Sequence, residues 1–191
     1  GSFNVYNIDY THRFKDKSNI SISGLYEHAM LDGYTKNRNL NSKNFTDTLQ
    51  YTFNTGENPL DAYRFKIDYE KVIGIGKLSL GYQFRNQVQK GTFNYYEKSG
   101  NFTQLIFNPS FSASIDVLNR IHGIYLQYSG VYKKLEFSGG MRYENAYRSF
   151  SANKSNTPVV LELSNLFPSA NFLYNFKDNL RLKLGYSKRV Q

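Results

Sequence analysis

Three histidines are the residues of this sequence best suited to ligate a metal or transfer a proton. His12, His28 and His122 lie far apart in the chain, and no pair has the i, i+2 or i, i+4 spacing of a metal site. Cysteine is absent, which excludes a disulfide framework, a thiolate zinc site and a cysteine nucleophile. The carboxylates are scattered, so no two can be assigned as general acid and base. The residues predict no catalytic site, no metal and no cofactor.

Aromatic residues in two polar stretches are the remaining candidates for ligand contact. Their rings could stack on a sugar or an aromatic ligand. The simpler interpretation is that they pack within long loops or lie near a membrane interface. These candidate ligand-contacting loop residues are Phe93, Tyr95, Tyr96, Tyr147, Arg148 and Phe150.

The charge of the chain does not point to nucleic acid. Although the formal net charge is +9, the basic residues are spread along the whole chain and no run of five or more like charges occurs. We therefore predict no nucleic-acid partner. The mean hydropathy of −0.58 and the lack of any stretch of about 18 apolar residues exclude a membrane-spanning helix. They are compatible with membrane strands, in which apolar and polar residues alternate.

Alternation with period two is the main structural signal. The sequence holds 17 Tyr and 15 Phe, residues that favour strands over helices. Apolar and polar residues alternate without a break in the segments 63–70, 77–85, 135–144 and 180–187. With four weaker segments added, the pattern predicts an all-β, antiparallel up-and-down meander of about eight long strands. Their expected ranges are 4–14, 19–31, 61–70, 77–88, 119–132, 135–148, 166–176 and 179–190.

The connections between these strands alternate between short and long. Tight turns are expected at 15–18, 71–76, 133–134 and 177–178, and long polar loops at 32–60, 89–118 and 149–165. The segment 45–53 also alternates, so we expect a strand extension or small hairpin inside the first long loop. In an up-and-down sheet this order puts every long loop at the same end, as in bacterial outer-membrane barrels. We expect residues 1–191 to form part of such a transmembrane β-barrel.

The alternation assigns a lipid-facing and a lumen-facing side to each strand. The residues expected to face outer-membrane lipid are Phe65, Ile67, Leu80, Tyr82, Phe137, Met141, Leu182 and Leu184. The opposite phase, expected to face a plug or water, carries Arg64, Lys66, Arg142, Glu144, Arg181 and Lys183.

Several hairpins resemble those of TonB-dependent receptor barrels. Gly139-Gly140-Met141-Arg142-Tyr143-Glu144 is similar to the G-x-R-Y-E strand common in that family. The segment 166–170, followed by 180–189, resembles the next hairpin, and 68–83 resembles an earlier one. The resemblance covers residues 60–191 well and 1–60 loosely. It is closest to the subfamily with a carboxypeptidase-regulatory-like domain ahead of its plug.

The resemblance implies a fragment of a TonB-dependent outer-membrane receptor, not an enzyme, in the outer membrane of a Gram-negative bacterium. Such a receptor imports a nutrient such as a metal chelate or glycan. The implied partners are the plug domain of the parent chain and TonB, reached through the parent chain. The alternatives are a soluble β-sandwich or adhesin-like binding module, whose apolar faces pack together, and a hydrolase on a β-scaffold, which no residue constellation supports.

The ends of the sequence suggest a segment cut from a longer protein, with the plug and remaining strands absent. Gly1 begins abruptly, and Val190-Gln191 ends within an apparent strand. Two unpaired edges and an uncovered apolar face would drive self-association of such a fragment. We expect it to bury its apolar face by an inside-out curl or by forming a dimer.

Overall fold

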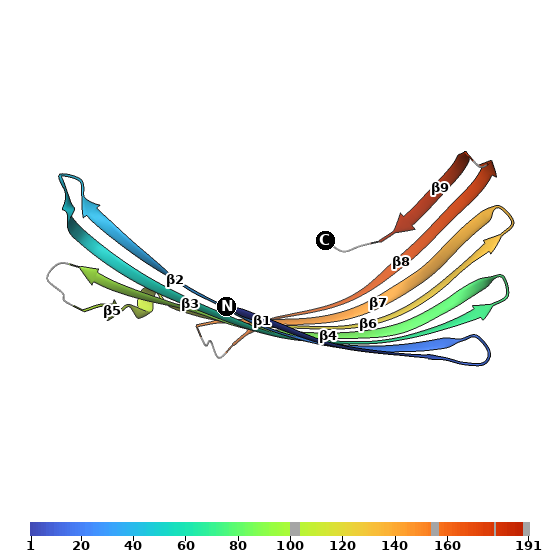
Figure 1. Cartoon of the computed structure of the whole chain (residues 1–191), viewed down its shortest axis with the longest axis horizontal. Coiled ribbons are helices and arrows are strands. Elements are labelled where there is room, and N and C mark those ends of the chain that lie inside the picture. Colours follow the sequence, from blue (N-terminus) through green and yellow to red (C-terminus); the bar gives the residue numbers. More distant parts are fainter. Residues whose placement is uncertain (100–103, 154–156, 178, 189–191) are drawn as a thin grey trace.

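One antiparallel sheet contains almost all of the chain (Figure 1). The computed structural model describes residues 1–99, 104–153, 157–177 and 179–188. The strands are β1 (Ser2–Arg13), β2 (Asn19–Asn41), β3 (Asn44–Ile73), β4 (Gly76–Ser99), β5 (Ile106–Phe107), β6 (Ala113–Tyr132), β7 (Leu135–Ala152), β8 (Val159–Lys177) and β9 (Leu180–Ser187). A short 3-10 helix, η1 (Pro109–Phe111), lies between β5 and β6.

The strands form a meander. Their order across the sheet is β1-β2-β3-β4-β6-β7-β8-β9, and every neighbouring pair is antiparallel. The two-residue strand β5 pairs with the outer part of β4. The predicted meander of about eight long strands is therefore confirmed.

The connections at one end of the sheet are tight. Two-residue turns join Ile73 to Gly76 and Tyr132 to Leu135, and they place Gly74 and Lys133 in the left-handed region at φ 59° and 54°. In the first turn, Asp16 accepts hydrogen bonds from the backbone and hydroxyl groups of Ser18. These bonds, together with Lys71 on the neighbouring strand, lower the pKa of Asp16 to about 2.

The three predicted long loops are mostly strand, which corrects the sequence-based assignment. β2 and β3 stay paired through residues 32–60, in regular register as far as Asn39 and Gln50 and with register shifts up to Asn41 and Asn44. The extension expected at 45–53 is therefore present. β4 continues to Ser99, β7 ends only at Ala152, and β8 already begins at Val159. Polar residues occupy both faces of these extensions, and alternation is therefore too weak to predict them. Asp178 of the fourth predicted turn and the predicted strand end at 189–191 lie outside the described residues.

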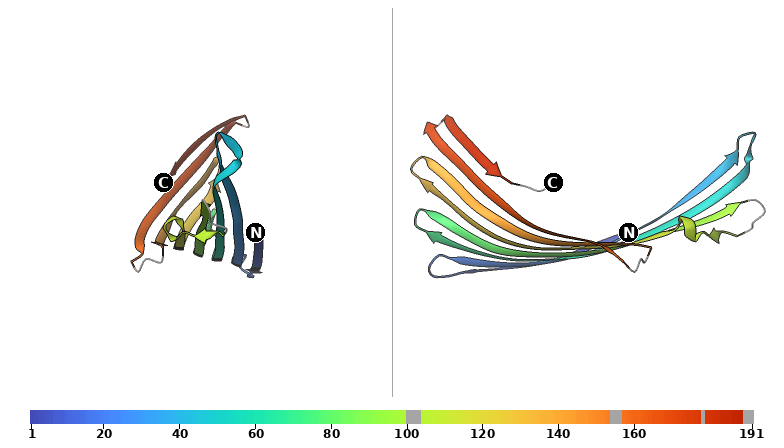
Figure 2. Two further views of the ribbon diagram at one scale, coloured as in Figure 1. Left: turned by 90° about the vertical axis from the view of Figure 1, so that its left-hand side faces the viewer. Right: turned by 180° about the vertical axis from the view of Figure 1, so that it is seen from behind.

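The sheet is strongly curved and open. It bends along its strands (Figure 1), and the edge strands β1 and β9 lie on opposite sides of the arc (Figure 2). Among the described residues, Ala29 is the one well-buried hydrophobic side chain, because a single layer has no interior core. A single sheet also disagrees with the β-sandwich alternative, which needs two sheets packed face to face.

Candidate functional site: the two faces of the sheet

The register assigns every strand residue to one of two faces, because directly opposed residues of antiparallel strands share a face. Ile67 lies opposite Tyr82, Leu126 lies opposite both Leu80 and Met141, and Phe172 lies opposite both Phe137 and Leu184. All eight residues expected to face lipid are thus on one face. The six charged residues of the opposite phase share the other face. Contact with lipid itself stays a prediction.

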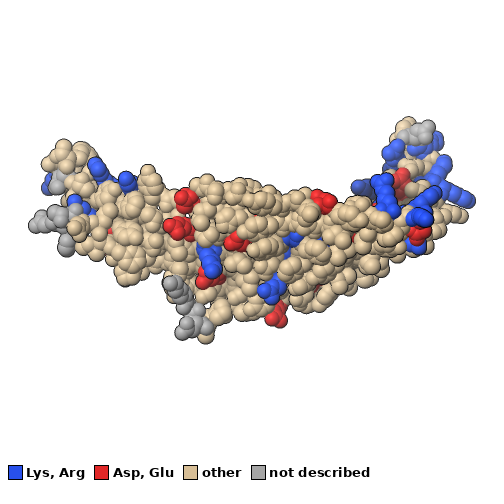
Figure 3. Space-filling model, turned by 60° about the horizontal axis from the view of Figure 1, so that its bottom comes forward, with Lys and Arg blue, Asp and Glu red and all other residues tan. Residues whose placement is uncertain are grey.

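The apolar face is the convex one. Across all eight long strands it contains a band without any Lys, Arg, Asp or Glu, which includes Ile22, Ile67, Leu80, Leu126 and Phe172. In Figure 3, the convex surface shows a broad area free of charge between charges near mid-sheet and a group of Lys and Arg at the end with the tight turns. Side chains here diverge, and Leu80, Met141 and Leu184 are 45%, 52% and 60% exposed. The inside-out curl is wrong, since it would have put these residues on the concave side.

Tyrosines mark the edge of this band on the side of the long hairpins. The rings of Tyr6, Tyr26 and Tyr63 form a stack across three strands, with centroids 6.2 and 4.9 Å apart. The Tyr26 hydroxyl donates to Asp61 at 2.8 Å, and the Tyr82 hydroxyl forms a 2.8 Å hydrogen bond with Nδ1 of His122. A tyrosine whose ring lies against apolar residues and whose hydroxyl bonds to a polar group is typical of a membrane interface.

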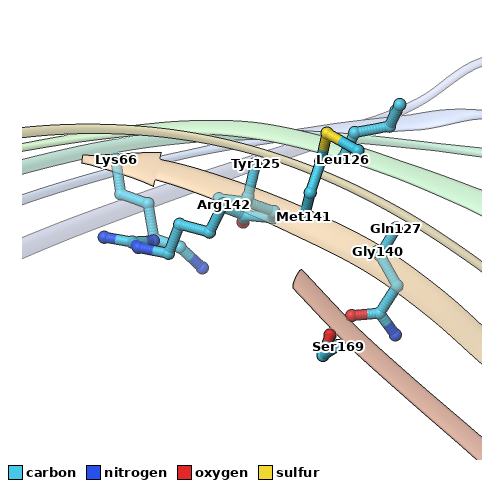
Figure 4. Close-up of a pocket in the computed structure, with 8 residues that line it drawn as sticks. All are labelled: Lys66, Tyr125, Leu126, Gln127, Gly140, Met141, Arg142 and Ser169. Atoms are coloured by element: carbon cyan, nitrogen blue, oxygen red, sulfur yellow. The ribbon is translucent and has the colours of Figure 1, made fainter. Parts of the chain in front are cut away.

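The concave face is polar, and its side chains are more tightly packed than those of the convex face. Arg142 donates from Nε to Glu144 at 2.6 Å and from Nη2 to Oε1 of Gln83 at 3.1 Å. Lys66 pairs with Asp68 at 2.6 Å. Lys66 and Arg142 both approach the ring of Tyr125, with their charged groups 6.0 and 5.8 Å from its centroid. These side chains line a hollow of about 370 Å³ (Figure 4).

Two glycines make room for this cluster. A Cβ atom at Gly81 would overlap the ring of Tyr125, and one at Gly123 would lie 2.6 Å from Nη2 of Arg142. Tyr125 and Gln83 belong to no motif that marks them in the sequence. Glycine inside an alternating strand is a sign of close approach by another group, so Gly81 and Gly123 were the available signal.

A pair of arginines stands beside this cluster without a counter-charge. Arg64 and Arg85 are directly opposed on β3 and β4, and like charges in this position repel each other. Neither takes part in any ion pair found among the described residues, and both are exposed. The two arginines therefore give this part of the concave face an excess of positive charge.

The six candidate ligand contacts do not form one site. Phe93, Tyr95 and Tyr96 lie in β4, while Tyr147, Arg148 and Phe150 lie in β7. The expectation that these six are loop residues is therefore wrong. The register puts Phe93, Tyr95, Arg148 and Phe150 on the concave face, and Tyr96 and Tyr147 on the convex face. Tyr95 and Tyr96 consequently cannot stack on the same ligand.

The histidines also stay apart. His28 bonds to Asp61 at 2.9 Å, His122 to Tyr82, and His12 packs its ring against Phe14. Within the described ranges, no group of three His, Asp or Glu side chains is placed to hold a metal ion. In the same ranges no helix is long and apolar enough to cross a membrane.

The sequence and the fold were compared with those of known proteins. Residues 12–191 match the outer membrane protein beta-barrel family. No curated protein matches the chain in sequence. Among solved structures, the unliganded ferric citrate transporter FecA aligns with a TM-score of 0.64 and 15% identity over 95% of this chain and 26% of its own.

Two other receptors give similar results. The siderophore receptor PiuA from Acinetobacter baumannii aligns with a TM-score of 0.61 and 13% identity, over 97% of this chain and 32% of its own. The closed form of the ferric-catecholate import receptor Fiu from E. coli K12 aligns with a TM-score of 0.60 and 10% identity, over 97% of this chain and 32% of its own. The chain therefore has the fold of part of a TonB-dependent receptor barrel, and spans about a quarter to a third of such a protein.

Proposed function

Because the chain belongs to the outer membrane protein beta-barrel family, we propose that it is part of the wall of a TonB-dependent receptor that imports a nutrient. Proteins of this family lie in the outer membrane of Gram-negative bacteria, where the convex apolar band contacts lipid. Residues 1–191 contribute strands to the barrel, and the remaining strands and the plug belong to the rest of the parent protein. TonB acts through that parent protein.

The observation that carries the proposal is the separation of the two faces. An apolar convex face and a charged concave face, on strands long enough to cross a membrane, suit a wall between lipid and a lumen. The unopposed pair Arg64 and Arg85 supports a plug as the occupant of that lumen. Carboxylates on a plug would remove the repulsion between the two guanidinium groups by charge-assisted hydrogen bonds.

The cargo we favour is a metal chelate, with a glycan as the alternative. Support comes from the similar structures, which include a ferric citrate transporter, a siderophore receptor and a ferric-catecholate import receptor. Phe93, Tyr95, Arg148 and Phe150 are the candidate ligand contacts that face the lumen. We further propose that the parent carries a carboxypeptidase-regulatory-like domain ahead of its plug, and that the chain has no enzymatic role.

Uptake by cells tests the proposal. Cells that express the parent protein should accumulate iron from a panel of ferric chelates, or a labelled oligosaccharide, only when TonB is present. Accumulation that is equal in cells lacking TonB would refute energy-driven import.

The plug contact can be tested separately. Replacing Arg64 and Arg85 together by Gln should loosen the plug and make cells sensitive to vancomycin, which is too large for an intact plugged barrel. Arg13→Gln, at the tight-turn end of the same face, is the matched control. Unchanged sensitivity of the double variant, at equal protein level in the membrane, would exclude a plug contact at these arginines.

A further inference from the structure

The hairpin of β2 and β3 extends far beyond the apolar band. From Tyr26, at the edge of the band, to Tyr34 the chain runs eight residues, which corresponds to ~27 Å along the strand. A strand needs only about 9–11 residues to cross a membrane, whereas β3 has 30. The outer part of this hairpin therefore stands clear of the lipid, and lipid cannot explain the aromatic rings found there.

Four aromatic rings form a continuous row across the outer hairpin on the convex side. Tyr34 packs against Phe53, Phe53 against Tyr96, and Tyr96 against Phe107, with centroid separations of 5.9, 6.1 and 5.5 Å. Tyr34 is 69% exposed and Phe107 46% exposed. Neighbouring rings are tilted to each other by 43°, 41° and 57°, and the ammonium group of Lys36 lies over Tyr34 and Phe53. The row therefore presents a stepped apolar platform to the outside.

Cations flank the platform. Nζ of Lys36 lies 5.3 Å from the ring centroid of Tyr34, and the guanidinium of Arg38 lies 5.9 Å from that of Tyr51. Lys98 is directly opposite Tyr51 on the same face. These three cations form none of the ion pairs found between described side chains. Among the acidic side chains that the structure describes, Asp32 and Glu57 are on this face and lie on the membrane side of the row.

A polar groove continues the platform at Phe107. Its volume is about 590 Å³, and its walls include Thr92, Asn94, Ser110, Ser114 and Asn153. Hydroxyl and amide groups both donate and accept hydrogen bonds, which matches the hydroxyl groups of a sugar. The segments that carry the platform, the cations and the groove are the outer parts of β2, β3 and β4 together with β5 and η1, which lie at the end of the sheet away from the tight turns (Figure 1).

We propose that this outer surface binds an acidic glycan. The aromatic row would stack against the apolar faces of sugar rings, and the groove would bind their hydroxyl groups. Lys36, Arg38 and Lys98 would bind the carboxylates of uronic acids. The site is separate from the concave face, so it is not the path of an imported solute. It depends on the proposed function only for placing the long hairpins outside the cell.

Binding to defined oligosaccharides tests the site. The full chain in detergent micelles is titrated with alginate oligosaccharides, which are chains of uronic acids, and with maltodextrins of equal length. We expect alginate to bind and its affinity to fall roughly tenfold in Lys36→Gln/Arg38→Gln. Tyr34→Ala should weaken binding to a similar degree even in high salt. Lys15→Gln/Lys17→Gln, at the opposite end of the sheet, and Tyr132→Ala, an exposed tyrosine there, are the matched controls.

Two outcomes would overturn the proposal. Alginate that binds no tighter than maltodextrin shows that the cations do not select an acidic glycan. Equal losses in the outer-hairpin and control variants show nonspecific attraction of a polyanion to a basic protein. Neither result bears on TonB-dependent uptake, which is measured in cells, so failure of this site and failure of the import proposal are distinguishable.

Discussion

At the residue scale, adjacent glycines in the motif Gly139-Gly140 have different roles. A Cβ at Gly140 would lie 2.7 Å from the carbonyl oxygen of Leu126 and 3.1 Å from the Cα of Gln127, both on the next strand. At Gly139, which faces the other way, nothing lies within 4 Å of the added atom. The close approach of β6 and β7 therefore requires a glycine at position 140 but not at position 139.

The two glycines predict opposite effects of the same substitution. Gly140→Ala should destabilise the folded sheet by about 1–3 kcal/mol, because backbone atoms of β6 must move. Gly139→Ala should be neutral or stabilise by up to about 1 kcal/mol, since it restricts the unfolded chain. Urea unfolding of the two variants after refolding into lipid vesicles gives the comparison. Equal losses would show that the register between β6 and β7 is different.

A second prediction concerns the neighbouring residues Leu182 and Lys183, which lie on opposite faces of β9. Leu182→Arg puts a charge in the apolar band, and the cost in a bilayer is at most the roughly 2–4 kcal/mol of a midplane position, because Leu182 lies near the tight turn between β8 and β9. Lys183→Arg keeps a charge on the concave side and should have little effect. The measurement is the free energy of unfolding from lipid vesicles. Similar values for the two variants would contradict the lipid-facing assignment.

At the element scale, the strands have two parts with different requirements. Within the apolar band, one face is apolar and the other is polar, so the two kinds of side chain alternate along each strand, as expected for a wall between lipid and a lumen. In the outer part, water reaches both faces, and backbone pairing continues with Asn, Thr and Tyr side chains. Pairing such as Gly33 with Gly56 shows that the hairpin of β2 and β3 keeps its register well past the band.

The outer hairpin should therefore be dispensable for assembly. Replacing residues 34–55 by Asn-Gly, a favoured two-residue hairpin turn, keeps Gly33 and Gly56 paired. We expect the shortened parent protein to reach the outer membrane and to keep its heat-modifiable migration in gels, while binding to alginate is lost. Removing residues 22–25 with their partners 64–67, inside the band, should abolish assembly. Loss of assembly in the first variant would show that the extension supports the barrel.

At the scale of the whole molecule, the sheet is curved but does not close. β1 and β9 each pair with a single neighbour in the described part of the chain, so both leave one side of their backbone unpaired. The apolar band is uncovered as well. Open strand edges and large apolar patches both promote association in water.

The 191-residue chain should consequently associate in buffer and separate in detergent. Sedimentation velocity should show dimers or larger species without detergent and a single protein–detergent particle above the critical micelle concentration. Arginine in place of both Leu80 and Met141 should reduce association in buffer, while arginine at Gln87 and Gln127, two exposed residues of the concave face, should not. A monomer in plain buffer would contradict association through the band or the edges.

The sequence by itself determined the class of fold, the face of each residue within the band and the order of tight turns. These features follow from alternation with period two and from turn residues, both of which are local. The segments around Phe65, Leu80, Phe137 and Leu182 were correct because one of their faces is purely apolar. Beyond the band this contrast disappears, and Phe93, Tyr95 and Phe150 were therefore assigned to loops although they lie in strands.

Only the tertiary structure decided the register between strands and the direction of curvature. Register determines that Arg64 meets Arg85, that Tyr125 covers Gly81, and that Tyr34, Phe53, Tyr96 and Phe107 form one row. Each of these contacts joins residues from different strands, so no local pattern carries it. Curvature determines which face is crowded and which diverges, because strand twist and coiling accumulate over the whole sheet. The polar side is the concave one, so the inside-out curl, one of the two arrangements expected from the sequence, does not form.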